Sequence, residues 1–596
     1  MNGPTKNGRR FQSRALIGLA TLATLVAVFY LEEDWRGKRA WEQCKAELAA
    51  KGAVLDWNKY LPPPVPDGQN FFTASTNILI RFRKAQTPAE RETEAKLPWL
   101  QNTYFPSFAK TKSPPLVVAQ INIVPNATAR PAADTNNLAL KFNAPGTTER
   151  VRNLLQKTIG QSLMGAIGFK FSELPMDRIT PAQIQLETEV TPSVADLETL
   201  LPAAQATNLG VLSIETSGDK SSFQVLLAGV QATPAEDYLK WTDQFIPALD
   251  EIREALKRPG AVLPGDYSEP FLIPIPNFVA LRATAQLLAQ RGQCHLLVGQ
   301  PDPALHEVTL MHDLCRILEK PPTGKPETLV EAMINVAITG LYVTTIGDGL
   351  RLNAWQAPQL AALQAQLREI SLPQWVAEAF REELAADVHT FETTPAYKIA
   401  DLFSGMGPQY KNPNAWSRLH DPLYLFLKFA PQGWICQNLV NVANLQPKPL
   451  GSFDLEQETV LPGAFAQADQ NAGKFFARKS PFRTLAAFAL PNFSKAVQTT
   501  AYNQNLVNEA QIVCALEQYH LARGEYPTTL EALLPQYLNK LPHDIIGGQP
   551  LHYRRTEAGS FVLYSIGWNE EDDGGTVALT KNGAEDRGHG DWVWGH

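Results

Sequence analysis

The chain has 596 residues and a formal net charge of −7, from 53 basic and 60 acidic side chains. Hydrophobic residues make up 44% of it, which supports packed domains and argues against a disordered chain. The small net charge and the lack of a basic cluster argue against nucleic acid as a partner. At this length we expect three or four domains, with 45 prolines marking turns and linkers.

An apolar segment near the N-terminus predicts a membrane anchor. Residues 15–31 carry no charge, and basic residues precede them while acidic residues follow. A helix of this length just spans a hydrocarbon core about 30 Å thick. Because no small-x-small cleavage site follows, an anchor is favoured over a cleaved signal peptide, and Arg9-Arg10 is interpreted as topogenic charge rather than a twin-arginine signal. The sequence predicts a single-pass protein of the bacterial inner membrane, with residues 1–14 cytoplasmic and the body periplasmic.

Two further features bear on this topology. A second crossing by the apolar run 329–346 would return the chain to the cytoplasm, but the run contains polar residues such as Glu331, so a buried core helix is predicted. Five cysteines are too few for a disulfide scaffold. Cys294 and Cys315 lie on consecutive predicted helices and could form a disulfide, although buried thiols are the favoured interpretation.

The predicted fold class is α+β multidomain. Residues 32–70 are predicted to form a stalk helix and a proline-rich linker, and residues 71–230 an irregular α/β region. Residues 231–480 are predicted to form a mainly α-helical domain, and residues 481–596 a C-terminal module. Strands are expected at 117–124 and 222–227, and helices at 148–163, 278–298, 304–318, 328–346, 357–370 and 374–388.

The C-terminal module is predicted to pack one helix on a small antiparallel sheet. Apolar residues recur every three or four positions over 506–519, and Gly524 ends this helix. Thr528 and Glu531 have the spacing of a capping box for a second helix. Runs at 551–555 and 561–566 alternate in polarity and predict a hairpin. We expect a small, self-sufficient core, with the tail Asp591-Trp-Val-Trp594 packed on the module or contacting a partner.

Short segments of this module carry a family resemblance: Cys514-Ala-Leu-Glu-Gln-Tyr519, Gly524-Glu-Tyr-Pro527, Leu530-Glu-Ala-Leu533, Tyr564-Ser-Ile-Gly567 and Asp572-Asp-Gly-Gly575. In order and spacing they resemble the globular head of the major pseudopilins of type II secretion systems. The resemblance implies a pilin-like docking head and a secretion-associated role. In pseudopilins a leader of the Gly-Phe-Thr-Leu-x-Glu type runs directly into the head's helix. Here the apolar segment lies far upstream and lacks that motif, so assembly into a pilus-like fibre is not expected.

The same resemblance implies a calcium site, because pseudopilins bind calcium in the loop after the last strand. Carboxylates and carbonyl oxygens are the ligands that Ca²⁺ prefers. Six acidic residues could converge there: Glu570, Asp572, Asp573, Glu585, Asp586 and Asp591. The spacing is not that of an EF-hand, and a solvated acidic turn is the alternative.

No catalytic motif stands out in the rest of the sequence. His306-Glu307 with His312 has the wrong spacing for a zinc-protease helix, because side chains six residues apart point away from each other. There is no Gly-x-Ser-x-Gly elbow, phosphate loop or Cys-x-x-Cys pair. We therefore predict a membrane-anchored binding or scaffold protein of the bacterial envelope, with a protein partner and without a small-molecule ligand or enzymatic activity. The alternative is a periplasmic hydrolase acting on peptide or glycan, with its site in the helical domain.

Overall fold

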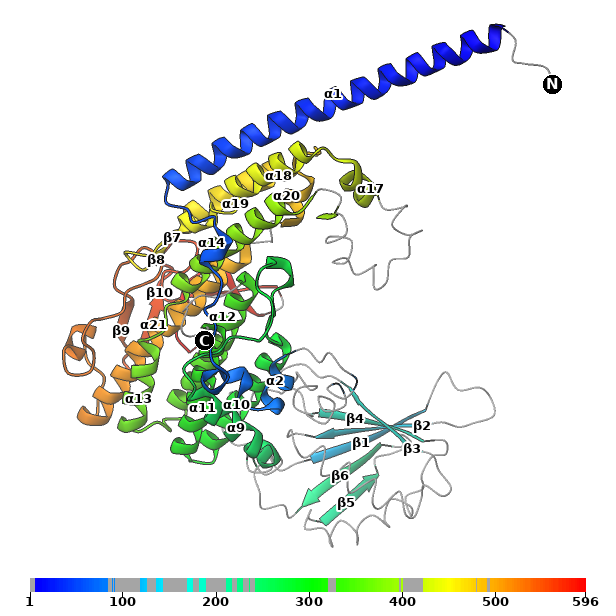
Figure 1. Ribbon diagram of the computed structural model, residues 1–596. Helices are drawn as coiled ribbons and strands as arrows, with labels where there is room; N and C mark the ends of the chain where they lie inside the picture. Colours follow the sequence, from blue (N-terminus) through cyan, green and yellow to red (C-terminus); the bar gives the residue numbers. More distant parts are fainter. Residues whose placement is uncertain are drawn as a thin grey trace.

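The computed structural model is a mixed α+β fold that is mostly helical (Figure 1). Its N-terminal helix contains the uncharged run 15–31, which we call the apolar half of this helix, and a small antiparallel sheet lies near the C-terminus. The structure describes these residues: 6–83, 88, 91, 118–125, 136–142, 169–174, 182–188, 211–216, 222–228, 235, 239, 242–319, 328–395, 398–399, 422–478, 480–489, 494–581 and 583–595.

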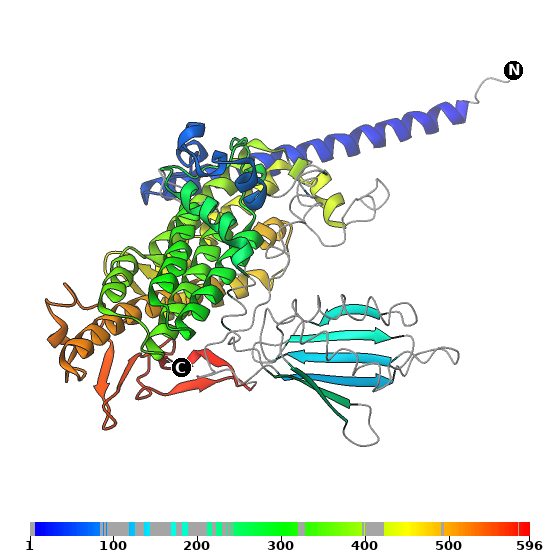
Figure 2. The ribbon, with the colours of Figure 1, turned by 90° about the horizontal axis from the view of Figure 1, so that it is seen from below.

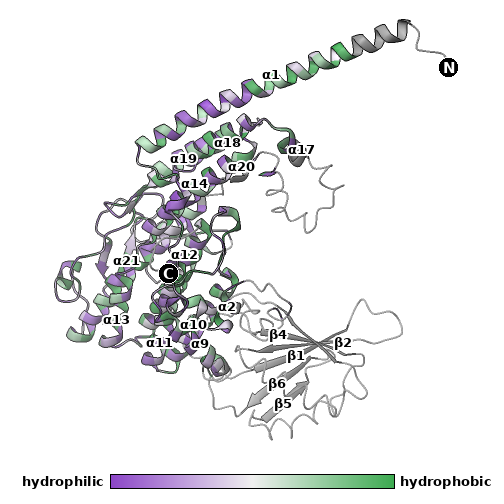
Figure 3. Cartoon of the chain, viewed as in Figure 1, coloured by the Kyte–Doolittle hydropathy of each residue, from purple (hydrophilic) through white to green (hydrophobic). Residues whose placement is uncertain are grey.

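Helix α1 (Lys6–Ala50) joins the predicted anchor and the predicted stalk without a break. Its residues change from apolar to polar toward the body (Figure 3). Figures 1 and 2 both show its N-terminal half projecting away from the other elements. The helix stops before Gly52, whose φ of +83° suits glycine, and residues 61–66 belong to no helix or strand, as expected of a proline run.

Two helices are long and apolar enough to cross a membrane, judged by length and composition alone. One is the segment Leu16–Ala50 of α1, and the other is α12 (Leu329–Arg351). In the apolar window of α1 only 6% is buried, whereas 61% is buried in that of α12. The prediction that the second apolar run is a core helix is confirmed, because α12 packs against α10, α11, α14 and α21.

The region predicted as irregular α/β contains one six-stranded antiparallel sheet, in the order β3-β4-β2-β1-β6-β5. Ile121 of β1 pairs with Leu140 of β2 on one side and Phe223 of β6 on the other. The two predicted strands are confirmed, while the helix predicted at 148–163 lies outside the described residues. The strands are β1 (Val118–Pro125), β2 (Asn136–Phe142), β3 (Phe169–Leu174), β4 (Ala182–Thr188), β5 (Val211–Thr216) and β6 (Ser222–Ala228).

The helical body follows the predicted pattern closely. The expected antiparallel hairpin is formed by α10 and α11, and the next three predicted helices are present. Asn277 and Thr328 begin α10 and α12 by accepting a backbone N–H through the side chain, as good N-caps do. The helices are α2 (Thr76–Phe82), α9 (Ile246–Leu256), α10 (Phe278–Leu297), α11 (Pro301–Glu319), α12, α13 (Ala357–Leu367), α14 (Leu372–Thr393), α17 (Pro422–Phe429), α18 (Gln432–Leu445), α19 (Pro462–Phe476) and α20 (Thr484–Ala489).

The C-terminal module is built on α21 (Ser494–Arg523), which ends at Gly524 with φ +77°. The predicted hairpin is confirmed as β9 (His552–Arg555) and β10 (Phe561–Ser565), and β13 (Trp592–Val593) adds a third strand beside β10. The C-terminal tail therefore packs on the module, where Trp592 is buried against Tyr502. The remaining strands are β7 (Phe453–Asp454), β8 (Thr459–Val460), β11 (Val577–Leu579) and β12 (Glu585–Gly590).

Two expectations for this module are wrong. The predicted second helix is one 3₁₀ turn, Leu530–Leu533, preceded by Thr529 rather than Thr528, and Pro535 follows closely and cannot continue a helix. The module also does not close a core of its own. Val513 and Leu563 belong to the same hydrophobic cluster as the body helices, and α21 packs mainly on α12, α13 and α14.

Candidate functional site

Asp591 organises the acidic loop that the sequence singled out. The residue is 1% exposed, and its carboxylate accepts the backbone N–H groups of Asp573 (3.2 Å), Gly575 (2.6 Å) and Thr576 (3.2 Å). Asp572 accepts the Tyr564 hydroxyl at 3.1 Å. The loop is thus folded around a buried carboxylate, since each donor needs an acceptor once it leaves water.

The other predicted calcium ligands do not join this cluster through their hydrogen bonds. Glu585 accepts the hydroxyl of Tyr502 at 2.7 Å, and Asp586 accepts the N–H of Gly588 at 3.0 Å. Glu570 has a left-handed φ of +61°, close to Gly463. Hydrogen bonding from Gly574 N–H lowers the pKa of Asp572, and hydrogen bonding from Gly588 N–H lowers that of Asp586. Among the described residues no group of three or more acidic, histidine or cysteine side chains has the geometry of a metal site.

A small polar cavity lies between α11, α12 and the start of α14. Its volume is about 130 Å³, and its lining includes His312, Cys315, Glu319, Thr339 and Trp375. Burial raises the pKa of the Cys315 thiol, so this sulfur stays protonated and is a poor nucleophile. The cavity is below the roughly 300–1,000 Å³ of typical small-molecule sites.

The disulfide considered between Cys294 and Cys315 does not form. All five cysteines are free thiols, and both of these are buried. Burial also raises the pKa of Cys294, so the interpretation as inert, buried thiols is confirmed for this pair.

A second cavity of about 270 Å³ lies where the body meets the C-terminal module. Its wall carries a row of amides on α21, namely Gln504, Asn508 and Gln511. These amides already hold neighbouring main chain, since Gln504 accepts the N–H of Leu372 at 2.8 Å and Asn508 donates to the carbonyl of His543 at 3.0 Å. Gln504 and Gln511, which donates to the carbonyl of Leu367 at 3.5 Å, therefore join the module to the body, while Asn508 holds a loop within the module.

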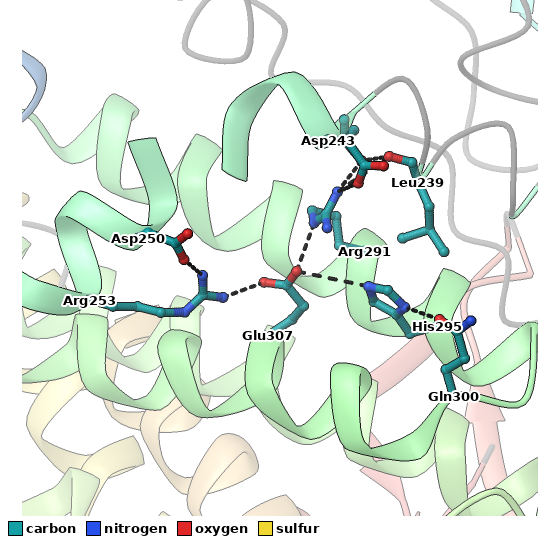
Figure 4. Close-up of polar contacts among 9 residues, drawn as sticks. Leu239, Asp243, Asp250, Arg253, Arg291, His295, Gln300 and Glu307 are labelled. Carbon is teal, nitrogen blue, oxygen red and sulfur yellow. Dashed lines mark hydrogen bonds and ion pairs between the residues drawn. The ribbon is translucent and has the colours of Figure 1, made fainter. Parts of the chain in front are cut away.

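A buried ionic cluster ties α9, α10 and α11 together (Figure 4). Glu307, which the sequence placed in a rejected zinc motif, accepts Arg291 Nε at 2.7 Å and Arg253 at 2.8 Å. Arg291 also reaches Asp243 at 3.3 Å. Desolvation lowers the pKa of His295, whose ring lies 4.0 Å from Glu307. One carboxylate shared by two arginines holds three helices together, and Glu307 lines neither of the two cavities described above.

Two acidic residues on α14 were missed by sequence reasoning. Glu383 and Asp387 are one helical turn apart and so share a face. Burial raises the pKa of Glu383 to about 7, and burial with the neighbouring Glu383 raises that of Asp387 well above its usual range. The signal available was this i, i+4 spacing in a helix that is otherwise apolar on that face.

The C-terminal part of α1, residues 33–50, packs against α18. The two helices cross at Gly37 and Gly433, where a methyl group on Gly37 would lie 2.1 Å from the Gly433 carbonyl oxygen. Asp34 accepts the Gly433 N–H at 2.7 Å, and Glu33 accepts the Trp434 indole N–H at 2.7 Å. After the crossing, toward the C-terminal end of α1, the buried residues Trp41, Cys44 and Leu48 join the core of α14, α18 and α20.

No protein-family model, curated protein or solved structure matches the chain. The resemblance to pseudopilins therefore stays a prediction from the short sequence segments.

Proposed function

We propose that the chain is a membrane-anchored scaffold or binding protein of the bacterial envelope. The apolar half of α1 would span the inner membrane, with the N-terminus in the cytoplasm and the body in the periplasm. The observation that carries the proposal is the division of α1 into two halves. The apolar half is almost entirely exposed, and the other half is packed into the body. A bare apolar helix of this length is costly in water and stable in lipid.

The C-terminal module would supply the docking surface for a protein partner, as its likeness to pseudopilin heads implies. Support comes from its attachment. Helix α21 shares the core of the body and contacts α14. Because α14 contacts α18 and α18 contacts α1, packed helices connect the module to the anchor helix without a break. The acidic loop held by Asp591 would be the place for calcium, with Asp572 and Asp573 as exposed candidate ligands.

The rival proposal is a periplasmic hydrolase of peptide or glycan. The polar cavity favours it in one respect, because His312, Glu319, Glu369 and Ser371 all line the same space. The volume of about 130 Å³ counts against it, since a peptide or sugar ring needs more room. His312→Ala would leave a scaffold unimpaired and would disable a hydrolase that works there.

Alkaline carbonate extraction tests the anchor. The unmodified chain should stay with the membrane pellet, and so should Trp35→Arg, which adds a charge to an exposed position beyond the apolar segment. The double variant Leu22→Arg/Leu25→Arg should be extracted, because each arginine near the centre of a spanning helix costs about 2.5–3.5 kcal/mol. Recovery of the unmodified chain in the soluble fraction would refute the proposal.

The docking role has a separate test. After detergent solubilisation from its native membrane, the chain should elute as a complex heavier than one detergent-bound copy. Leu579→Asp, which charges an exposed apolar side chain of the module, should reduce that mass. Val279→Asp, at an exposed apolar position of α10 in the body, is the control for an added surface charge and should leave the mass unchanged. A single-copy mass for the unmodified chain would contradict docking.

A further inference from the structure

Helix α17 lies against the end of the apolar half of α1. The Tyr30 hydroxyl donates to the main-chain carbonyl of Phe429, the last residue of α17. Phe29 meets Trp434 edge to face, with ring centroids 6.1 Å apart, and Phe426 stacks on the same indole at 5.7 Å. Aromatic residues from three segments therefore gather at one level of α1.

Phe429 is placed on the outside of this group. Its side chain is 69% exposed, although Leu427 beside it is fully buried. The helix reads Pro422-Leu-Tyr-Leu-Phe-Leu-Lys-Phe429, with Lys428 as its one charged residue. The ring does not stand alone, because it adjoins the exposed apolar side chains of α1, where Phe29 is 44% exposed, and so extends one apolar surface.

The position of Tyr30 along α1 indicates what surrounds the Phe429 ring. Residues 15–31 extend only about 25 Å at 1.5 Å per residue, which is slightly less than a hydrocarbon core of about 30 Å. The whole segment is therefore needed inside the membrane, and Tyr30 lies at the boundary between acyl chains and headgroups. The main-chain carbonyl of Phe429 accepts the Tyr30 hydroxyl, so Phe429 lies at the same depth in the membrane.

We propose that the end of α17 is a second membrane contact, in which the Phe429 ring inserts among phospholipid acyl chains and Lys428 lies among the headgroup phosphates. This inference rests on the proposed anchor, and it adds a contact made by the folded body itself. Phenylalanine is common on the lipid-facing side of helices that lie at the membrane surface, and lysine is attracted to anionic headgroups there. With α1 and α17 both held, the body cannot turn about the axis of α1, so the C-terminal module keeps a fixed orientation relative to the bilayer.

Site-specific photo-crosslinking in the full chain tests this contact. A benzophenone amino acid replaces Phe429 in protein reconstituted into phosphatidylethanolamine–phosphatidylglycerol vesicles, and lipid adducts are counted by mass spectrometry. Leu25, which is 62% exposed in the apolar segment, is the positive control. Leu521, which is 52% exposed on α21, is the negative control. All three side chains are exposed, so the replacements leave the core intact.

We expect lipid adducts at positions 25 and 429 in comparable yield, and at least tenfold fewer at 521. Adducts at 25 without adducts at 429 would overturn the second contact and leave the anchor in place. Adducts at neither position would overturn the anchor, and the present inference with it. Adducts at 429 to protein instead of lipid would also overturn it, by showing that a polypeptide covers the ring.

Discussion

The crossing of α1 and α18 makes a sharp prediction about two glycines. A methyl group on Gly433 would lie 1.9 Å from the carbonyl oxygen of Glu33, and one on Gly37 would lie 2.1 Å from that of Gly433. Both clashes are with backbone, which cannot rotate aside. Non-bonded atoms need about 3.5–4.0 Å, so the helices would have to separate by more than about 1 Å. Gly37→Ala and Gly433→Ala should each destabilise the attachment by about 1–3 kcal/mol, as overpacking does.

A glycine-to-alanine substitution away from the crossing serves as the control, and it should change the stability in the opposite direction. Gly473 lies in α19 with no atom near its missing side chain. Gly473→Ala should therefore stabilise the chain by about 0.5–1 kcal/mol through helix propensity alone. The double variant Gly37→Ala/Gly433→Ala should cost less than the sum of its parts, because the first substitution already moves the helices apart.

Hydrogen exchange gives the most local measurement of this effect. Amides of residues 37–50 in detergent-solubilised protein should exchange faster in both crossing variants, by about tenfold for each 1.4 kcal/mol lost. The same amides should keep their native rates in Gly473→Ala. Native exchange rates in Gly37→Ala and Gly433→Ala would refute the close crossing.

Three further predictions concern buried charge and the acidic loop. Glu307→Gln should cost about 1.5–3 kcal/mol in denaturant unfolding, because Arg291 and Arg253 lose the buried carboxylate that they share and keep only their exposed partners Asp243 and Asp250. Glu254→Gln, in an exposed pair, should cost under about 1 kcal/mol. The pKa of Glu383 is about 7 in the folded state and 4.5 ordinarily, so the folded state binds the proton more tightly. The free energy of unfolding should therefore fall as the pH rises between these two values, and Glu383→Gln should remove that part of the fall. A variant with the same pH profile as the unmodified chain would contradict the burial of Glu383. Millimolar Ca²⁺ should raise the melting temperature, Asp572→Asn should abolish the rise, and the absence of any shift would reject the calcium site.

The sequence was a good guide wherever a pattern is local. The polar alternation around Gly559 predicted the β9–β10 hairpin, and Glu331 within an apolar run identified α12 as a core helix. Gly524 ended its helix as expected, because glycine adopts the left-handed conformation of that position most readily.

Contacts between distant segments could not be predicted in this way. The approach of Gly37 to Gly433 depends on two helices far apart in the chain, and neither glycine stands in a motif. The role of Asp591 depends on three backbone N–H groups that point at it only in the folded loop. The shared core of α21 was missed because its apolar stripe shows that the helix is buried but not what buries it. Helix α17 was missed because eight residues are too few for a periodic signal.

The central claim is that one apolar helix tethers a periplasmic body, and the sidedness of the C-terminus tests it most directly. A tag placed after residue 596 should be removed by protease added to intact spheroplasts, while a tag placed before residue 1 should survive until the membrane is lysed. Protection of the C-terminal tag, with loss of the N-terminal one, would contradict the account.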